Sequence, residues 1–305
     1  PQGFTIENGI IVPQDWFAIV FNPSFPYRLA HMAMASFLVS ALLVAATAAF
    51  HLLKGRRDAL VKKSFSMAMW MILALAPLQM FVGDLHGLNT LEHQPAKLAA
   101  MEGHWETNKD HGMPLYLFGI PDMEAEETKY AIGIPNLGSL IMTHTLDGEV
   151  KGLKEFAPED RPNSLVVFWS FRIMVGLGVL MILMAVLGAW LRKTDKFYDS
   201  VGLHRFALYM GPSGFIALLA GWFTTEVGRQ PWVVYGVLRT KDTLSPVSAE
   251  QVGLTLIIFV MVYFIVFGVG IFYMLKLMRK GPEFIHSAPH SEQAIIQASI
   301  RPLST

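Results

Sequence analysis

Five long apolar stretches dominate the pattern of hydrophobic and polar residues along this chain. A membrane-spanning helix needs ~20 mainly apolar residues to cross ~30 Å of hydrocarbon, and each stretch meets that length. We therefore predict an all-α fold, a polytopic transmembrane helix bundle of about five spans. The predicted spans cover residues 27–53, 64–83, 164–191, 206–225 and 252–275.

Basic residues cluster in the short polar connections between these spans. Lys54, Arg56 and Arg57 follow the first span, and similar groups follow the third and fifth spans. Short basic loops stay on the cytoplasmic side, so the segment between the second and third spans should face outward. The predicted order is a lead-in at the outer face (1–26), two helices (27–83), an outward loop (84–163), three helices (164–277) and a cytoplasmic tail (278–305).

Two spans contain residues that interrupt helices. Pro77 lies in the second span, and the run 211–214 (GPSG) lies in the fourth. Proline removes a backbone hydrogen bond and clashes with the preceding turn, so we expect a kink or local unwinding at both places.

Composition agrees with a membrane protein and excludes several functions. Hydrophobic residues make up 53% of the chain, charged residues only 16%, and 24 basic residues balance 24 acidic ones. No global basic surface therefore points to nucleic acid. Cysteine is absent, which excludes disulfides, thiolate zinc sites and iron–sulfur clusters. Any metal must be bound by His, Met or carboxylate side chains.

The outer end of the fourth span carries the chain's most informative motif, GWFTTEVGRQPW at 221–232. Glu226 and Arg229 stand three residues apart on it. Either they form an interfacial ion pair of little energetic consequence, or the carboxylate ligates or protonates something inside the bundle, because charges within spans are costly.

The chain resembles subunit I of the cytochrome bd-type quinol oxidases. The GRQPW core of the motif is highly specific, and the resemblance covers nearly the whole sequence. The short form of the outer loop is typical of the cyanide-insensitive branch. The other matching segments are RLAH at 28–31, KLAAME at 97–102, WET at 105–107, FGIPD at 118–122 and FRIM at 171–174.

The resemblance implies three iron ligands in this chain. His31 and Met174 would be the axial ligands of a low-spin haem b, and Glu226 the carboxylate ligand of a high-spin haem b. Haem d, or a haem b replacing it, would complete the oxygen site. Without the resemblance, His31 fits a hydrogen-bonded helix residue, and Met174 fits ordinary packing.

The resemblance also places Lys97 and Glu102 in a quinol-oxidising loop. Glu102 can accept a hydroxyl proton and Lys97 can orient a quinone oxygen. The alternative for this pair is a solvated pair on a helix surface. The histidines of the same loop have spacings that match no standard zinc site.

Three further residues have candidate roles beside the haems. Arg172 lies ~12 Å inside the third span and either snorkels outward or neutralises haem propionates, although it points ~200° away from Met174 around an ideal helix. Trp222 shares a helix face with Glu226, so both can contact one haem. Arg229 either balances propionate charge or only pairs with Glu226.

The implied activity is electron transfer from quinol to oxygen in a bacterial inner membrane. His31, Met174 and Glu226 all fall in the outer halves of their spans, so the redox centres should lie near the outer face. Quinol oxidation would then release protons outside, while oxygen reduction would take up protons drawn from the cytoplasm. Oxidase subunit II is an expected partner. The amino-terminal spans of the family are missing, and we expect a longer parent chain. The competing interpretation is a secondary transporter or a structural membrane subunit.

Overall fold

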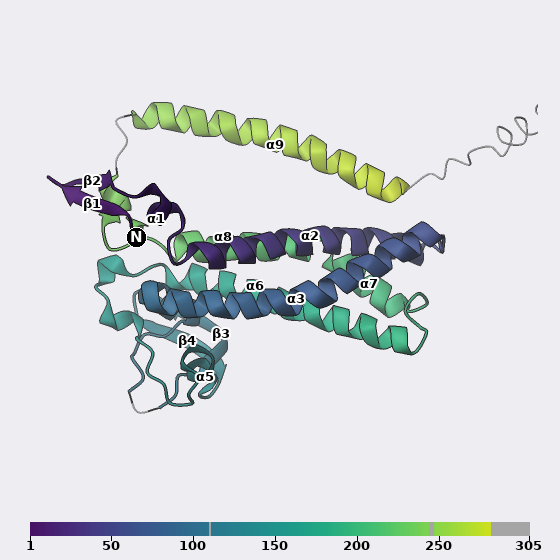
Figure 1. Ribbon diagram of the computed structural model, residues 1–305, viewed down its shortest axis with the longest axis horizontal. Coiled ribbons are helices and arrows are strands. Elements are labelled where there is room, and N and C mark those ends of the chain that lie inside the picture. The colour runs from purple at the N-terminus through teal and green to yellow at the C-terminus, as the bar shows by residue number, and fades with distance from the viewer. Residues whose placement is uncertain (110, 244–246, 282–305) are drawn as a thin grey trace, which may run out of the picture. The chain divides into compact units, whose positions relative to one another are not determined.

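The computed structural model describes residues 1–109, 111–243 and 247–281, and it confirms the predicted all-α bundle (Figure 1). Five segments of the described chain are long and apolar enough to cross a membrane. The chain divides into two compact units, Pro1–Val247 and a second that begins at Ser248. The spanning helices are α2 (Phe25–Leu53), α3 (Ala59–His93), α6 (Ser164–Lys193), α7 (Val201–Met210) with α8 (Ser213–Val227), and α9 (Ala249–Lys280).

Polar side chains fix the starts of most of these helices. The Asp58 carboxylate accepts a hydrogen bond from the Val61 amide at 3.0 Å at the start of α3. Asn163, Ser200 and Ser248 cap α6, α7 and α9 in the same way. Each cap satisfies an amide that has no partner within its helix, so the short polar connections define where the apolar helices begin.

The core of the first unit is built on small residues of α2. Ala45 and Ala49 are fully buried and let α3 and α7 approach closely, while Phe65 and Met184 fill the space between the helices. Figure 1 shows α2, α3, α6, α7 and α8 running side by side along one direction. Shape complementarity between small and large residues is the usual basis of helix packing in membranes.

The fourth span is broken where the GPSG run predicts a break. α7 ends at Met210 and α8 starts at Ser213, whose hydroxyl donates to the Met210 carbonyl at 2.6 Å. A Cβ on Gly211 would lie 2.8 Å from the Cβ of Ala46 on α2, so this glycine allows close contact. Pro77, in contrast, lies inside α3 without ending it.

α3 is longer than its apolar stretch predicts. The helix passes Gly83 and ends at His93, so the first turns of the segment expected as outer loop are helical. Gln94 has φ −141° and ψ 61° because the following residue is Pro95, and a residue before proline disfavours helical angles.

Within the described residues, three short antiparallel hairpins add to the helices, and the sequence analysis did not predict them. The first turns at Asn8 and Gly9, which both have positive φ, as tight hairpin turns require. The small elements are β1 (Phe4–Glu7), β2 (Ile10–Pro13), α1 (Trp16–Val20), α4 (Pro95–Glu102), β3 (Leu115–Asp122), β4 (Glu127–Ile134), α5 (Leu137–Thr143), β5 (Trp232–Val234) and β6 (Leu238–Arg239).

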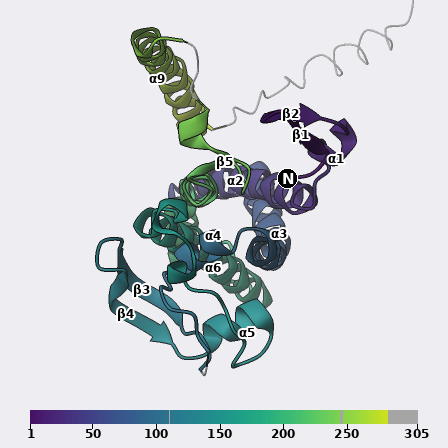
Figure 2. The same cartoon turned by 90° about the vertical axis from the view of Figure 1, so that its left-hand side faces the viewer.

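The segment between α3 and α6 is a folded layer at one end of the bundle (Figures 1 and 2). Its centre is α4, which contacts α3 and α6. At the other end, Arg57 forms an ion pair with Asp199, so the basic turns after the first and third spans lie together. Which end faces the cytoplasm stays a prediction, and most of the predicted tail lies outside the described residues, which end at 281.

Candidate functional site

α4 lies across the bundle end with almost no exposed side chain. Pro95 starts the helix and Gly103, at φ +71°, ends it; a Cβ there would lie 3.0 Å from the Phe168 ring. Lys97 is only 5% exposed and Glu102 only 1%. The alternative of a solvated surface pair is therefore wrong for these two residues, because both charged side chains point into the protein.

Glu102 is paired with Arg172 of α6. The guanidinium Nη2 donates to Glu102 Oε2 at 2.8 Å, and Nε donates to the backbone carbonyl of Tyr116 at 2.6 Å. The guanidinium carbon also lies 4.6 Å from the centre of the Phe168 ring. Arg172 thus joins α6 to α4 and β3. Its predicted role at haem propionates stays a prediction, with two donors already occupied by protein acceptors.

Lys97 points the other way, toward the end of α8. Its Nζ donates to the Thr225 carbonyl at 3.3 Å, and a Cβ on Gly228 would lie 2.9 Å from its Cγ. Burial is the main cause that lowers the pKa of Lys97 to about 8; the charges of Arg28 and Arg229 contribute to this lowering, and that of Glu226 opposes it. Lys97 therefore shares one electrostatic environment with the Glu226 motif.

Glu226 and Arg229 form the i, i+3 ion pair that the spacing predicts. Both side chains keep about a third of their exposure, at 36% and 34%, whereas Arg229 Nε is buried without a hydrogen-bond partner. Trp222, on the preceding turn, is 56% exposed and contacts Phe223. The ion pair does not exclude a ligand role, because the Glu226 carboxylate remains accessible.

His31 and Met174 each face a glycine on a neighbouring helix. A Cβ on Gly83 of α3 would lie 3.2 Å from His31 Cε1, and a Cβ on Gly221 of α8 would lie 2.8 Å from Met174 Sδ. The Nδ1 atom of His31 is buried without a hydrogen-bond partner. A buried polar atom without a protein partner is rare in native proteins and calls for an explanation, such as a role in binding a ligand.

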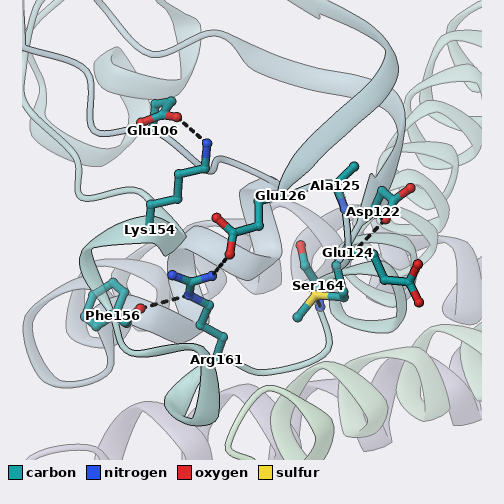
Figure 3. Close-up of polar contacts among 10 residues, drawn as sticks. Glu106, Asp122, Glu124, Ala125, Glu126, Lys154, Phe156, Arg161 and Ser164 are labelled. Carbon is teal, nitrogen blue, oxygen red and sulfur yellow. Dashed lines mark hydrogen bonds and ion pairs between the residues drawn. The ribbon is translucent and has the colours of Figure 1, made fainter.

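Further contacts hold the layer together, and the Ser164 amide at the start of α6 donates to Met123 Sδ at 3.4 Å (Figure 3). Arg161 donates from Nη1 to Glu126 at 2.6 Å and from Nε to the Phe156 carbonyl at 2.8 Å. Lys154 pairs with Glu106. Burial lowers the pKa of His104. The layer is therefore a stable support that positions α4, rather than a loose connection.

Several site residues could not be recognised from the sequence. Gly83 and Gly221 look like ordinary span glycines, because the side chains they accommodate lie on other helices. His86, whose ring centre lies 6.0 Å from that of His31, stands in the sequence among the loop histidines. Arg28 lies in the RLAH segment that matches the family, but the sequence assigned it no role. Its Nε is buried without a hydrogen-bond partner.

Comparisons with known proteins agree with one another. Residues 1–282 match the family model described as cytochrome bd terminal oxidase subunit I. The chain is 34% identical over 295 residues to the cytochrome bd ubiquinol oxidase subunit 1 of Bacillus subtilis (strain 168), covering 93% of this chain and 62% of the relative. It is 28% identical over 342 residues to the cytochrome bd-II ubiquinol oxidase subunit 1 of Escherichia coli (strain K12), covering 90% and 66%.

A solved structure has the same fold. The structure of bd oxidase from Geobacillus thermodenitrificans superimposes with a TM-score of 0.83 at 33% sequence identity. The match covers 92% of this chain and 64% of that chain. The chain thus spans less than two thirds of the length of each of these three proteins.

Proposed function

This chain belongs to the cytochrome bd terminal oxidase subunit I family, and from that premise we propose that it carries the quinol-oxidising and low-spin haem region of a respiratory quinol:oxygen oxidoreductase. The named relatives are quinol oxidase subunits, so the family match does not favour the alternative of a transporter or structural subunit. The partners would be oxidase subunit II, the amino-terminal part of subunit I, membrane quinol and oxygen.

The observation that carries the proposal is the environment of His31 and Met174. Each side chain lies against a glycine of a neighbouring helix, where a Cβ would crowd it, and His31 Nδ1 is buried without a hydrogen-bond partner. These residues fit a haem, because imidazole and thioether are its common axial ligands in electron-transfer proteins. When bound, the haem supplies one-electron transfer. A His/Met pair would leave no open position on the iron for oxygen.

Glu226 is proposed as the carboxylate ligand of a second, high-spin haem b, with Trp222 beside it. Arg229 holds the carboxylate in place through the ion pair. A third haem, haem d or a haem b in its place, would complete the oxygen site.

The quinol site is proposed at α4. Lys97 orients a quinol oxygen, and Glu102, whose Oε2 accepts a hydrogen bond from Arg172 at 2.8 Å, accepts a hydroxyl proton. In the proposed orientation this end of the bundle faces outward. Protons from quinol are then released outside, while those for oxygen reduction come from the cytoplasm, which translocates charge without a pump.

The test is a reduced-minus-oxidised spectrum of the purified oxidase with Met174→Leu. We expect the low-spin haem b band to be lost or shifted. The matched control is Met184→Leu, which changes a fully buried methionine on the same helix and should leave the band unchanged. An unchanged spectrum in Met174→Leu would refute the ligand assignment.

The quinol site has a separate test. Lys97→Met and Glu102→Gln should each lower quinol oxidation by about tenfold or more, while oxygen consumption with an artificial electron donor persists. If both activities fall together, the residues serve the haem region and not the quinol site.

A further inference from the structure

Arg28 occupies a position that the proposed function leaves unexplained. It lies on the first turn of α2, three residues before His31. Residues three apart on a helix share a face, and the rise of 1.5 Å per residue puts Arg28 about 4.5 Å closer to the bundle end than His31. A ligand bound to His31 would therefore present its outer edge to Arg28.

The guanidinium of Arg28 has no acceptor in the part of the chain that the structure describes. Its Nε is buried without a hydrogen-bond partner, and none of the ion pairs between described residues includes it. Arg28 is half-buried, and the carboxylate that acts on it electrostatically, that of Glu226, already pairs with Arg229. Desolvating a cation without an acceptor of its own is costly. The surrounding protein thus stabilises Arg28 poorly unless an anion from outside the chain completes the site.

Positive charge is in excess around this position. Arg28, Lys97 and Arg229 interact electrostatically, and among the described residues the acidic group that acts on Lys97 is Glu226, which is already paired with Arg229. Three cations therefore share one carboxylate. The Nε of Arg229 is also buried without a partner, so a second guanidinium has an unused donor at the same bundle end.

Arg172 was, with Arg229, one of the two sequence-based candidates for a propionate partner, but its donors are used differently. Glu102 and the Tyr116 carbonyl accept from Nη2 and Nε, and aromatic rings pack against its plane. Its charge is thus already compensated by Glu102. Arg28 has neither a carboxylate nor a carbonyl acceptor among the described residues, which makes it the better counter-ion for a bound carboxylate.

We propose that Arg28 binds a propionate carboxylate of the haem ligated by His31, and so fixes the orientation and the reduction potential of that haem. The inference rests on the proposed function, because it assumes a haem at His31. A cation beside the propionate stabilises the reduced iron, since reduction adds one negative charge to the cofactor. Removing the charge must lower the reduction potential.

The experiment is a redox titration of the low-spin haem band in the purified oxidase with Arg28→Gln and Arg28→Lys. We expect a lower midpoint potential in Arg28→Gln and a potential close to the parental one in Arg28→Lys. Arg205→Gln is the matched control, because it removes the same charge from an exposed position on α7. Its potential should be unchanged.

Three outcomes would overturn the proposal. A parental potential in Arg28→Gln would show that Arg28 does not interact with the haem. A shift that disappears once anionic lipid is removed by exchange into maltoside would show that the bound anion is a lipid phosphate. Loss of the haem in Arg28→Gln with retention in Arg28→Lys supports the proposal, whereas loss in both variants assigns Arg28 to packing. Absence of the band from the parental protein would instead refute the proposed function.

Discussion

The buried ion pair between Glu102 and Arg172 gives the most direct test of how α4 is held. Arg172→Met removes the cation and leaves the Glu102 carboxylate, 2% exposed in its side chain, without a counter-charge. At 2.8 Å and an effective dielectric constant of about 20, the lost Coulomb attraction is about 6 kcal/mol. Desolvation offsets part of it, and breaking such a pair typically costs about 3–5 kcal/mol.

That cost should appear as local opening of α4. A loss of about 3–5 kcal/mol raises the open population by about two to four orders of magnitude. Hydrogen exchange of the α4 amides, measured by mass spectrometry on the purified oxidase, reports this population directly. Glu102→Gln should cost less, because the amide oxygen still accepts a hydrogen bond from Arg172.

A control and a double variant make the test decisive. Glu124→Gln makes the same change at an exposed position of the same layer and should alter protection by at most about 0.5 kcal/mol. The double variant Glu102→Gln with Arg172→Met should cost less than the sum of the single changes. If Arg172→Met exchanges at the rate of the Glu124→Gln control, the ion pair does not hold α4.

Three further outcomes follow from the geometry. Gly221→Ala should disturb the low-spin haem spectrum and cost about 1–3 kcal/mol in thermal stability, because the added Cβ would lie 2.8 Å from Met174 Sδ. Gly176→Ala is the control and should do neither, because its added Cβ has no atom within 4 Å. Gly83→Ala, at 3.2 Å from His31 Cε1, should give a smaller spectral change in the same assay. The pKa of Lys97 is lowered from 10.5 to about 8 in the folded protein, so the unfolded chain binds this proton more tightly. The parental protein should therefore gain thermal stability relative to Lys97→Met as pH rises from about 8 toward 10.5. A stability difference that does not change with pH would contradict the lowered pKa.

Apolar runs were enough to predict the bundle, because a bilayer demands long apolar helices wherever the chain crosses it. The GPSG run similarly predicted the break between α7 and α8. Hydropathy could not find the end of α3, because a helix that continues past the membrane needs no apolar residues. The end is set by the backbone angles that Pro95 imposes on Gln94.

The contacts of the candidate site could not be predicted from the sequence. The motifs pointed to Lys97 and Glu102, yet the acceptor of Lys97 is Thr225, 128 residues away, and the partner of Glu102 is Arg172, 70 residues away. No local pattern carries such long-range pairs. For the same reason the unpartnered Arg28 could not be recognised, since a missing acceptor becomes visible only when all neighbouring elements are in place.

α4 is tied by polar side chains to two spanning helices at once. Lys97 reaches the Thr225 carbonyl in the last turn of α8, and Glu102 reaches α6 through Arg172. α4 therefore connects the two spans that carry Met174 and Glu226. A molecule that displaces α4 must therefore disturb the surroundings of both residues together.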